Sequence, residues 1–512
     1  MTGVVLSRRP ARPARVLRIE IRRSVVPWAI PLLVALFLAD TYRTAAGLPP
    51  VWTVRSSVIT NNMLVDFLPF AAGLAAWVGS REGRRKTRDV LTTTVRPALL
   101  RQAAALGATL FWLLLVFLAG VVVLYVATAL QATWGGPPLW PVAVGAVGVL
   151  TVTVVGFTAG ALFPSRFTAP LAAIGVVLLS LVGDHAALNV GPGTSTYALL
   201  SPIAGMPLSD DGVLYHAAPD VAIAQVMFMG GVSVALLGLL ALAPVSRVPC
   251  RGLLSAVGRT GRWLCAIGVG LLVAGVAASS TAYALAGTAR LGVSGWDIPA
   301  LHDAASDQPV PYTPDCAGTS FKVCVHPAFG AYLDDANAAL QPVAAEIAGL
   351  PGAPVRTALV AAGDGVQSGG ASYTPQPMPY IAGTPPVFSY TYYTFLSPPW
   401  NDPAIPNDVH DGPWNSSLQQ QLLTAFVAQS ASSSSILGPA QQAVIVALMG
   451  AVGSHVHVFP GGDGVKVGGP SAMQITVAGQ RFGSLAPAAR HAWLVTHLAA
   501  LRAGTITLAQ LP

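Results

Sequence analysis

Long apolar runs separated by short polar segments make up about the first 290 residues of the chain. A helix needs about 20 mostly apolar residues to cross the hydrocarbon layer of a bilayer. Seven segments reach or approach that length, at about 25–45, 62–80, 102–128, 141–163, 168–184, 221–244 and 263–287. The first is interrupted by Asp40, and the fifth is short. The pattern predicts seven membrane-spanning helices.

The pattern changes after about residue 289, where Pro, Ser, Asp and Asn interrupt shorter apolar segments. Some of these segments have apolar residues at helical spacing, and others are rich in β-branched and aromatic residues. We expect helices at 326–350, 416–430, 438–452 and 485–503, and strands at 355–362 and 388–395. These roughly 220 residues are enough to bury a core of their own, so we predict a separate α+β domain.

Basic residues are concentrated beside the predicted spans. About two thirds of the 28 Lys and Arg lie in four clusters, at 8–23, 81–101, 166 and 247–262. Cytoplasmic loops of membrane proteins are enriched in Lys and Arg. The segment 131–140 carries no charge and the segment 184–220 carries only acidic charges, so both are placed outside and the N-terminus in the cytoplasm. An odd number of spans then places the residues after about 287 outside the cell membrane.

The composition agrees with this topology. The chain is 53% hydrophobic and 10% charged, whereas a soluble domain has about 25% charged residues. A net charge of +7 would suit nucleic acid, but the basic residues follow the span ends, so we exclude that partner. The predicted fold is a polytopic α-helical membrane protein with a C-terminal extracytoplasmic α+β domain. Its parts are a basic cytoplasmic connecting helix (1–24), a six-span domain (25–245), a cytoplasmic linker with the seventh span (246–288) and the outer domain (289–512).

The four cysteines divide between the two sides of the membrane. Cys316 and Cys324 lie in the predicted outer domain, where oxidising conditions permit a disulfide. Closing so short a loop would stabilise the fold by roughly 2–3 kcal/mol. Two buried free thiols are the alternative. Cys250 is predicted to be cytoplasmic and Cys265 to lie within a span, so both should stay reduced.

The chain has no ATP-binding P-loop, because that motif requires a Gly-Lys pair. The lysines are Lys86, Lys322 and Lys466, and each follows a residue other than glycine. We therefore expect this chain to bind no cofactor. If transport is driven by ATP, then ATP and Mg²⁺ are bound by a partner ATPase.

The predicted cytoplasmic segment 80–101 is the best candidate for contact with such a partner. It is charged at its start, and Val90 and Leu91 are two consecutive apolar residues in its middle. A short helix with an apolar patch and a charged rim can dock in a groove of another protein. An ordinary basic loop on the cytoplasmic side explains the same residues.

This layout resembles the membrane subunits of ABC-2 type transporters over about residues 1–245. Those subunits begin with a basic amphipathic connecting helix, which residues 8–23 resemble, and continue with six spans. Their linker after span two acts as a coupling helix that touches the ATPase. The residues that look like this linker are Glu82, Gly83, Thr92, Thr93, Thr94 and Arg96, with Arg84 and Arg85 among them.

The resemblance implies a permease subunit of an exporter, which pairs with itself as a homodimer and with two copies of a cytoplasmic ATPase. The chain itself would then not be an enzyme. The seventh span and the outer domain depart from the six-span pattern. The stretches 324–329, 350–356 and 493–512 look like those of fused actinobacterial forms of the family that carry both additions. The resemblance names no cargo.

Polar residues within the predicted spans are few. Asp66 follows Asn61 and Asn62 near the predicted outer end of span two. A carboxylate at the centre of a span costs about 2.5–3.5 kcal/mol on insertion scales, so buried ones are usually functional. We favour an interfacial position for Asp66, from which it reaches the headgroups. Small residues four apart on span seven predict a packing stripe, at Ala266, Gly270, Ala274, Ala278 and Ala282.

Two other classes of function remain open, both acting through the outer domain: a membrane-anchored sensor or interaction protein, and an envelope enzyme. No glutamate adjoins a histidine and no G-x-S-x-G occurs, which excludes two common hydrolase motifs. His455 and His457 share one face only if they lie in a strand. His491 and His497 are about 240° apart on a helix. We therefore expect no metal site.

Overall fold

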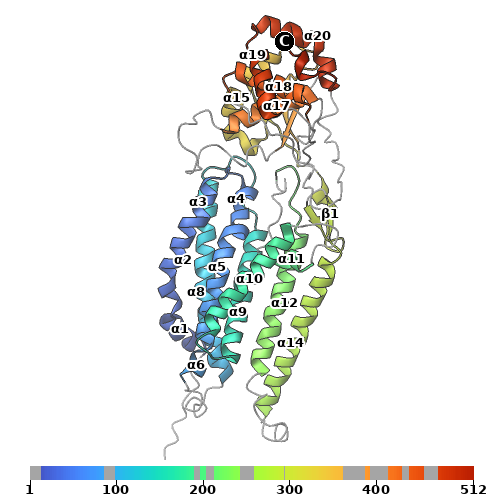
Figure 1. The fold of residues 1–512 in the computed structure, drawn as a ribbon. Helices are drawn as coiled ribbons and strands as arrows, with labels where there is room; N and C mark the ends of the chain where they lie inside the picture. The colour runs from blue at the N-terminus through green and yellow to red at the C-terminus, as the bar shows by residue number, and fades with distance from the viewer. Residues whose placement is uncertain are drawn as a thin grey trace, which may run out of the picture.

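A computed structural model describes residues 13–85, 98–188, 196–202, 213–242, 259–292, 295–308, 310–360, 387–391, 413–428, 437–454 and 471–512. Long helices lie side by side in a bundle, and a smaller domain that carries the C-terminus covers one end of it (Figure 1).

The bundle begins with two long helices that change type along their length. The first combines α1 (Pro13–Arg23), the 3-10 turn η1 (Val26–Ala29), α2 (Ile30–Leu36), the π-helical η2 (Phe37–Tyr42) and α3 (Arg43–Ala46). The second combines α4 (Trp52–Val58), the π-helical η3 (Ile59–Met63) and α5 (Leu64–Gly79). It begins at Trp52 rather than at the predicted residue 62. The polar residues Thr60, Asn61 and Asn62 interrupt the apolar run in the sequence, but they lie inside η3.

The remaining long helices are α8 (Ala98–Ala129), α9 (Trp140–Leu162), α10 (Thr168–Leu188), α12 (Asp220–Leu242) and α14 (Arg259–Ala286), with the short α6 (Arg81–Arg84) and α11 (Thr196–Leu200). Among the described residues, six helices are long and apolar enough to cross a bilayer. This confirms the polytopic membrane character that the sequence predicts. α10 lies at the position of the predicted fifth span and packs against α5 and α9. Its apolar stretch, Thr168–Ser180, is shorter than those of the six long apolar helices.

Glycines bring α5 and α9 into close contact. A Cβ placed on Gly156 would lie 2.2 Å from the carbonyl oxygen of Ala72, and one on Gly160 would lie 2.2 Å from that of Ala76. The two glycines have the G-x-x-x-G spacing that lets membrane helices approach backbone to backbone. No larger residue fits at either position without moving the helices apart.

α12 and α14 pack along each other in the same way. A Cβ on Gly275 would lie 2.3 Å from the backbone nitrogen of Ala235, and one on Gly238 would lie 2.6 Å from the carbonyl oxygen of Gly268. Gly268 and Gly275 are seven residues apart, the spacing that returns to the same side of a helix in coiled-coil packing. The seventh predicted span is therefore held tightly against the sixth.

The small-residue stripe predicted for span seven is wrong at most of its positions. Ala266, Gly270 and Ala274 are exposed at the bundle surface, and a Cβ on Gly270 would meet nothing within 4 Å. Only Ala282 of that stripe is fully buried. A spacing of four drifts around a helix of 3.6 residues per turn, whereas the observed contact follows a spacing of seven.

The C-terminal domain is built around helices. They are α15 (Leu333–Ile347), α17 (Pro413–Ala428), α18 (Pro439–Ala451), α19 (Ala472–Gly483) and α20 (Pro487–Arg502). Its strands are β1 (Arg290–Gly292), β2 (Gly295–Asp297), β3 (Asp315–Ala317), β4 (Val323–Val325), β5 (Arg356–Val360) and β6 (Val387–Thr391). Among described residues these pair as antiparallel β1–β2, antiparallel β3–β4 and parallel β5–β6. The α+β class stays a prediction, because strands of three to five residues contribute little beside the helices.

The core of this domain extends onto the loops of the bundle. Val51 and Val54, at the start of α4, belong to the same buried cluster as Phe329 and Leu422 of the domain. The hydroxyl of Thr133, in the loop between α8 and α9, donates a 2.6 Å hydrogen bond to the carbonyl of Pro327. The domain therefore sits on the ends of the helices through apolar as well as polar contacts.

Replacing Gly160 with alanine should loosen the α5–α9 contact, because its Cβ would overlap the Ala76 carbonyl. Overpacking of this kind costs about 1–3 kcal/mol. We expect a lower Tm for detergent-solubilised Gly160→Ala. Gly175→Ala on α10 is the matched control, since nothing lies within 4 Å of its added Cβ. Equal Tm values for the two variants would contradict the close contact.

Candidate functional site

The predicted coupling segment begins at the end of the bundle farthest from the C-terminal domain, where α6 and α1 lie (Figure 1). Its described part covers Glu82, Gly83, Arg84 and Arg85, and Arg101 at the start of α8. The other predicted coupling residues, Thr92, Thr93, Thr94 and Arg96, lie outside the described residues.

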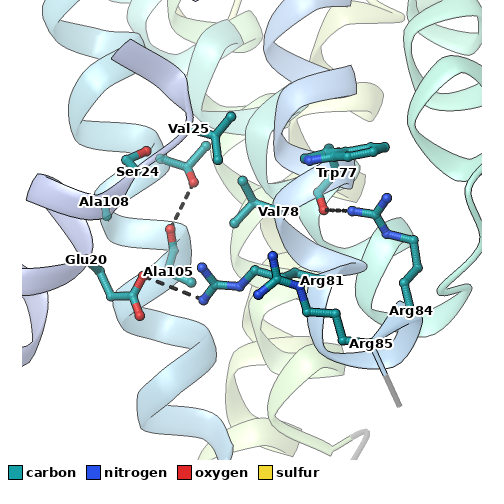
Figure 2. A pocket seen from close by; sticks show the side chains of 11 residues that line it. Glu20, Ser24, Val25, Trp77, Val78, Arg81, Arg84, Arg85, Ala105 and Ala108 are labelled. Carbon is teal, nitrogen blue, oxygen red and sulfur yellow. Dashed lines mark hydrogen bonds and ion pairs between the residues drawn. The ribbon is translucent and has the colours of Figure 1, made fainter. Parts of the chain in front are cut away.

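A cavity of about 200 Å³ opens at this end, between α1, the α5–α6 turn and α8 (Figure 2). One side of it is basic and the other is apolar. Its lining residues are Glu20, Ser24, Val25, Trp77, Val78, Arg81, Arg84, Arg85, Ala105, Ala108 and Thr109. Figure 2 shows Arg81 of α6 reaching across toward Glu20, whereas Arg84 folds back onto Trp77.

Two ion pairs hold α6 between its neighbours. Arg81 Nη2 lies 3.6 Å from Glu20 Oε2 of α1, and Arg101 Nε of α8 lies 3.5 Å from Glu82 Oε1. All four side chains are partly exposed, so each pair contributes at most about 1 kcal/mol to stability. Their effect is on position, since they connect the short helix to two different long helices.

Arg84 is fixed against the end of α5. Its Nη2 donates a 3.0 Å hydrogen bond to the carbonyl of Trp77, and its guanidinium lies 3.6 Å from the centre of the indole ring. Trp77 is 45% exposed, and Arg85 is exposed beside it. The result is an aromatic and cationic surface at the rim of the cavity. Such a surface suits acidic and apolar side chains of another protein.

The structure brings the predicted intramembrane residue Asn62 together with Asp40. Asn62 Nδ2 donates a 2.9 Å hydrogen bond to Asp40 Oδ2. Both residues lie in π-helical segments, a helix type that is rare and frequent at functional sites. Asp66 is half-buried one turn further along α5. Because the helix begins at Trp52, Asp66 lies more than ten residues into it, not a few residues from its end as the sequence suggests.

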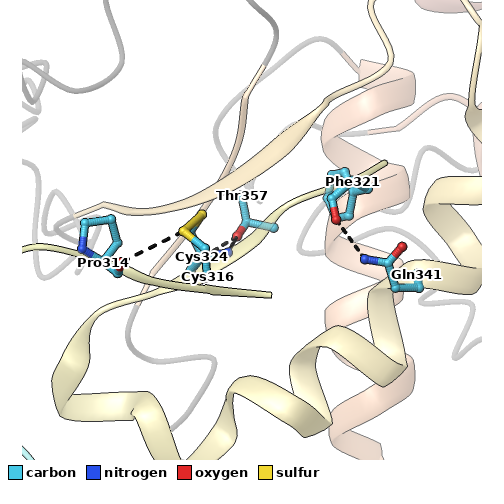
Figure 3. Close-up of a disulfide and its surroundings, with 6 residues drawn as sticks. All are labelled: Pro314, Cys316, Phe321, Cys324, Gln341 and Thr357. Carbon is cyan, nitrogen blue, oxygen red and sulfur yellow. Dashed lines mark hydrogen bonds between the residues drawn. A yellow bond between two sulfur atoms is a disulfide. The ribbon is translucent and has the colours of Figure 1, made fainter. Parts of the chain in front are cut away.

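Cys316 and Cys324 are joined by a disulfide that links opposite residues of β3 and β4 (Figure 3). The hairpin is anchored on both sides. Thr357 of β5 accepts a 2.7 Å hydrogen bond from the Cys324 N–H and donates one of 2.9 Å to its carbonyl. Gln341 of α15 donates to the carbonyl of Phe321 at 2.7 Å. The disulfide therefore fixes the hairpin that leads into the helical core.

His326 is a buried residue at the junction between domain and bundle. Its ring lies 5.0 Å from that of Trp134, in the α8–α9 loop, and 4.1 Å from that of Tyr312. Its Nδ1 accepts a 3.0 Å hydrogen bond from the N–H of Ala328. Burial lowers the pKa of His326 to about 4. The imidazole is therefore neutral at physiological pH.

The other histidines considered in the sequence have ordinary surroundings where they are described. His491 lies 3.1 Å from the carbonyl of Ala348, and His497 stacks on Trp493. His455 and His457 lie outside the described residues.

The sequence prediction missed a cluster around His302, in the segment that follows β2. His302 Nδ1 lies 3.1 Å from Asp220 Oδ2 and 3.5 Å from Asp297 Oδ1, and its Nε2 lies 3.1 Å from Asp307 Oδ2. The hydrogen bond with Asp307 is the main cause that raises the pKa of His302. The only signal in the sequence is the density of Asp and His between 297 and 307. Asp220 is 77 residues before Asp297 in the chain.

No family model, curated protein or solved structure matches this chain. Its function has to be inferred from the arrangement of its own residues and from the sequence pattern.

Acidification should destabilise the protein through His326. Its pKa is about 4 when folded and 6.5 in the unfolded reference, so the unfolded chain takes up a proton that the folded chain does not. The stability contribution is present above pH 6.5 and is lost as the pH falls toward 4, by roughly 3 kcal/mol in total. We expect Tm to fall more steeply between pH 7 and 4.5 in the wild type than in His326→Asn.

Asparagine is the suitable replacement because it does not titrate and still provides a side-chain acceptor at the start of a helix. The comparison removes the contributions of the other titrating groups, which the two proteins share. Parallel Tm curves over this pH range would show that His326 does not stay neutral in the fold.

Proposed function

We propose that this chain is the membrane-spanning subunit of an ATP-driven exporter of the ABC-2 type, energised by a separate ATPase. The observation that carries the proposal is the position of α6. This charged helix is held between Glu20 of α1 and Arg101 of α8, beside a cavity with a basic and an apolar side. A coupling helix needs such a place, because it must be accessible to a partner and joined to several spans.

A push on α6 would reach the bundle through direct contacts. α6 continues α5 with little interruption, since Ser80 N donates to Ala76 O and Arg84 N donates to Ser80 O, both at 3.0 Å. α5 in turn contacts α9 backbone to backbone at Gly156 and Gly160. Binding of ATP to the partner would therefore move α5 and α9 together, and rocking of packed helices is a common route to opening a path.

The same proposal places the basic end in the cytoplasm and the C-terminal domain outside. The described basic residues of the clusters lie after the end of α5, at the starts of α8 and α14, and between α9 and α10. The C-terminal domain covers the opposite ends of these helices (Figure 1). The positive-inside rule then gives the orientation. One such unit forms half of a translocation path, so we propose a homodimer in the cell membrane with the domain over its exit.

Charge removal at α6 should weaken binding of the ATPase. We expect affinity-purified full-length protein from native membranes to retain a P-loop ATPase, and Glu82→Ala or Arg84→Ala to reduce that association at least tenfold. The matched control is Arg166→Ala, a single basic residue in the loop between α9 and α10. Wild-type protein that never retains an ATPase would overturn the exporter proposal.

A charge exchange separates two roles for Glu82. If Glu82 acts only by pairing with Arg101, the double variant Glu82→Arg with Arg101→Glu should restore the association that Glu82→Arg loses. If Glu82 contacts the ATPase itself, the double variant should remain defective. Co-purification of the ATPase and ATPase activity of the complex measure both outcomes.

Reporter fusions test the orientation. Alkaline phosphatase, which is active only outside the cytoplasm, should be active when fused after Pro512, and green fluorescent protein should be dark there. Fusions after Leu242, at the basic end of α12, should give the reverse. Fluorescence at Pro512 would contradict the proposed topology.

A further inference from the structure

We infer that Asp220, Asp297 and His302 bind a divalent metal ion of the zinc class where the C-terminal domain joins the helix bundle. The three residues come from separate elements: the first residue of α12, the end of β2 and the segment after it. One potential ligand atom from each lies within 4.8 Å of the other two. This site is independent of the proposed export function.

The distances fit metal coordination. Zinc lies about 2.0–2.2 Å from nitrogen and oxygen ligands, which places ligand atoms about 3.3–3.6 Å apart in a tetrahedral site. His302 Nδ1 is 3.1 Å from Asp220 Oδ2 and 3.5 Å from Asp297 Oδ1. The ligand atoms of Asp220 and Asp297 lie within 4.8 Å of each other, so an ion would draw these two carboxylates closer together.

Asp220 provides the strongest independent indication of a ligand. Its side chain is fully buried. Oδ2 accepts a 2.9 Å hydrogen bond from the N–H of Ile298, but Oδ1 has no hydrogen-bond partner among the described residues. A buried carboxylate with an unsatisfied oxygen is costly. Coordination of a metal by both oxygens would satisfy it, and the side chain itself has no surface exposed to bulk solvent.

Asp307 completes the arrangement expected around a metal-bound histidine. Such a histidine almost always uses its second ring nitrogen to donate to a carboxylate or carbonyl, which fixes the orientation of the ring. His302 Nε2 lies 3.1 Å from Asp307 Oδ2. This contact leaves Nδ1 directed at Asp220 and Asp297. Asp307 is therefore a positioning residue and not a ligand.

The donor set selects the class of metal. Imidazole nitrogen suits zinc and similar transition metals, whereas Mg²⁺ and Ca²⁺ prefer oxygen ligands alone. His302 and Asp297 keep 16% and 17% of their side-chain surface exposed, so an ion can enter from solvent, and a water can complete the coordination. The bound metal would join the start of α12 to the segment that leads from α14 into the domain.

The test uses the full-length protein in detergent, stripped with a chelator and reloaded with Zn²⁺ or Co²⁺. We expect one equivalent of Zn²⁺ per chain by mass spectrometry of the metal, and Co²⁺ bands typical of a four- or five-coordinate site. Asp220→Asn and His302→Gln should lose both signals. Asp307→Asn should weaken Zn²⁺ binding about 10–100-fold, as outer carboxylates usually do.

Asp303→Asn is the matched control, because Asp303 is exposed in the same segment and its carboxylate accepts from the N–H of Ala305, which asparagine can replace. It should bind Zn²⁺ like the wild type. If Asp220→Asn does not fold, Asp297→Asn gives the same readout from a partly exposed position. Failure of the wild type to bind Zn²⁺ more tightly than these ligand variants would overturn the site and leave a cluster of hydrogen-bonded charges. The ATPase association plays no part in this result.

Discussion

Backbone contact between helices at glycine is the constraint on which the membrane part of this protein depends. In lipid, apolar side chains gain little by meeting each other, so helices associate through close packing and interhelical hydrogen bonds. Gly156 and Gly160 bring α9 onto α5, and Gly238 and Gly275 do the same for α12 and α14. The bundle therefore contains two helix pairs, α5–α9 and α12–α14, that touch backbone to backbone.

The junction with the C-terminal domain is held by other interactions than the helix pairs, because it lies beyond the apolar part of the helices and includes polar groups. A buried neutral histidine, a hydrogen bond from Thr133 and apolar residues from two loops share one interface. Burial of apolar surface stabilises such contacts, and the Thr133 hydroxyl and His326 Nδ1 are hydrogen-bonded within them. The domain is thus part of the folded unit rather than a module attached by a linker.

The sequence predicts the parts of this architecture that depend on length and periodicity. Apolar runs of about 20 residues give the long helices, and helical spacing gives α15, α17, α18 and α20. α19 is not among the predicted helices, although the capping box formed by Ser471 and Gln474 is a sequence signal for its start. The start of the second long helix was misplaced, since a π-helical segment accommodates polar residues that look like a boundary in the sequence.

The candidate sites also divide into those that a local sequence pattern predicts and those that depend on the packing of whole helices. The cysteine pair joined in the structure is the one that its spacing and predicted compartment select. The resemblance to a coupling linker indicates Glu82, but nothing in the sequence indicates that its neighbour is Arg101. The cluster around His302 could not be found, because Asp220 reaches it only after α12 and α14 have packed side by side. Contacts of this kind depend on the arrangement of whole helices, which no local pattern contains.

The two π-helical segments have a consequence for how the first two spans can evolve and move. A π-turn amounts to one additional residue in a helix, and each residue rotates the following side chains by about 100°. In η2 and η3 this extra residue turns the helix halves nearer the C-terminal domain so that Asp40 meets Asn62. The opposite halves, α1 and α5, keep their own contacts with α8. Loss of one residue from either segment would restore a regular helix and rotate the acidic and amide side chains apart. The Asp40–Asn62 hydrogen bond therefore depends on where each π-turn lies in its helix. Moving a π-turn along its helix would rotate the side chains on one side of it and leave those on the other side in place.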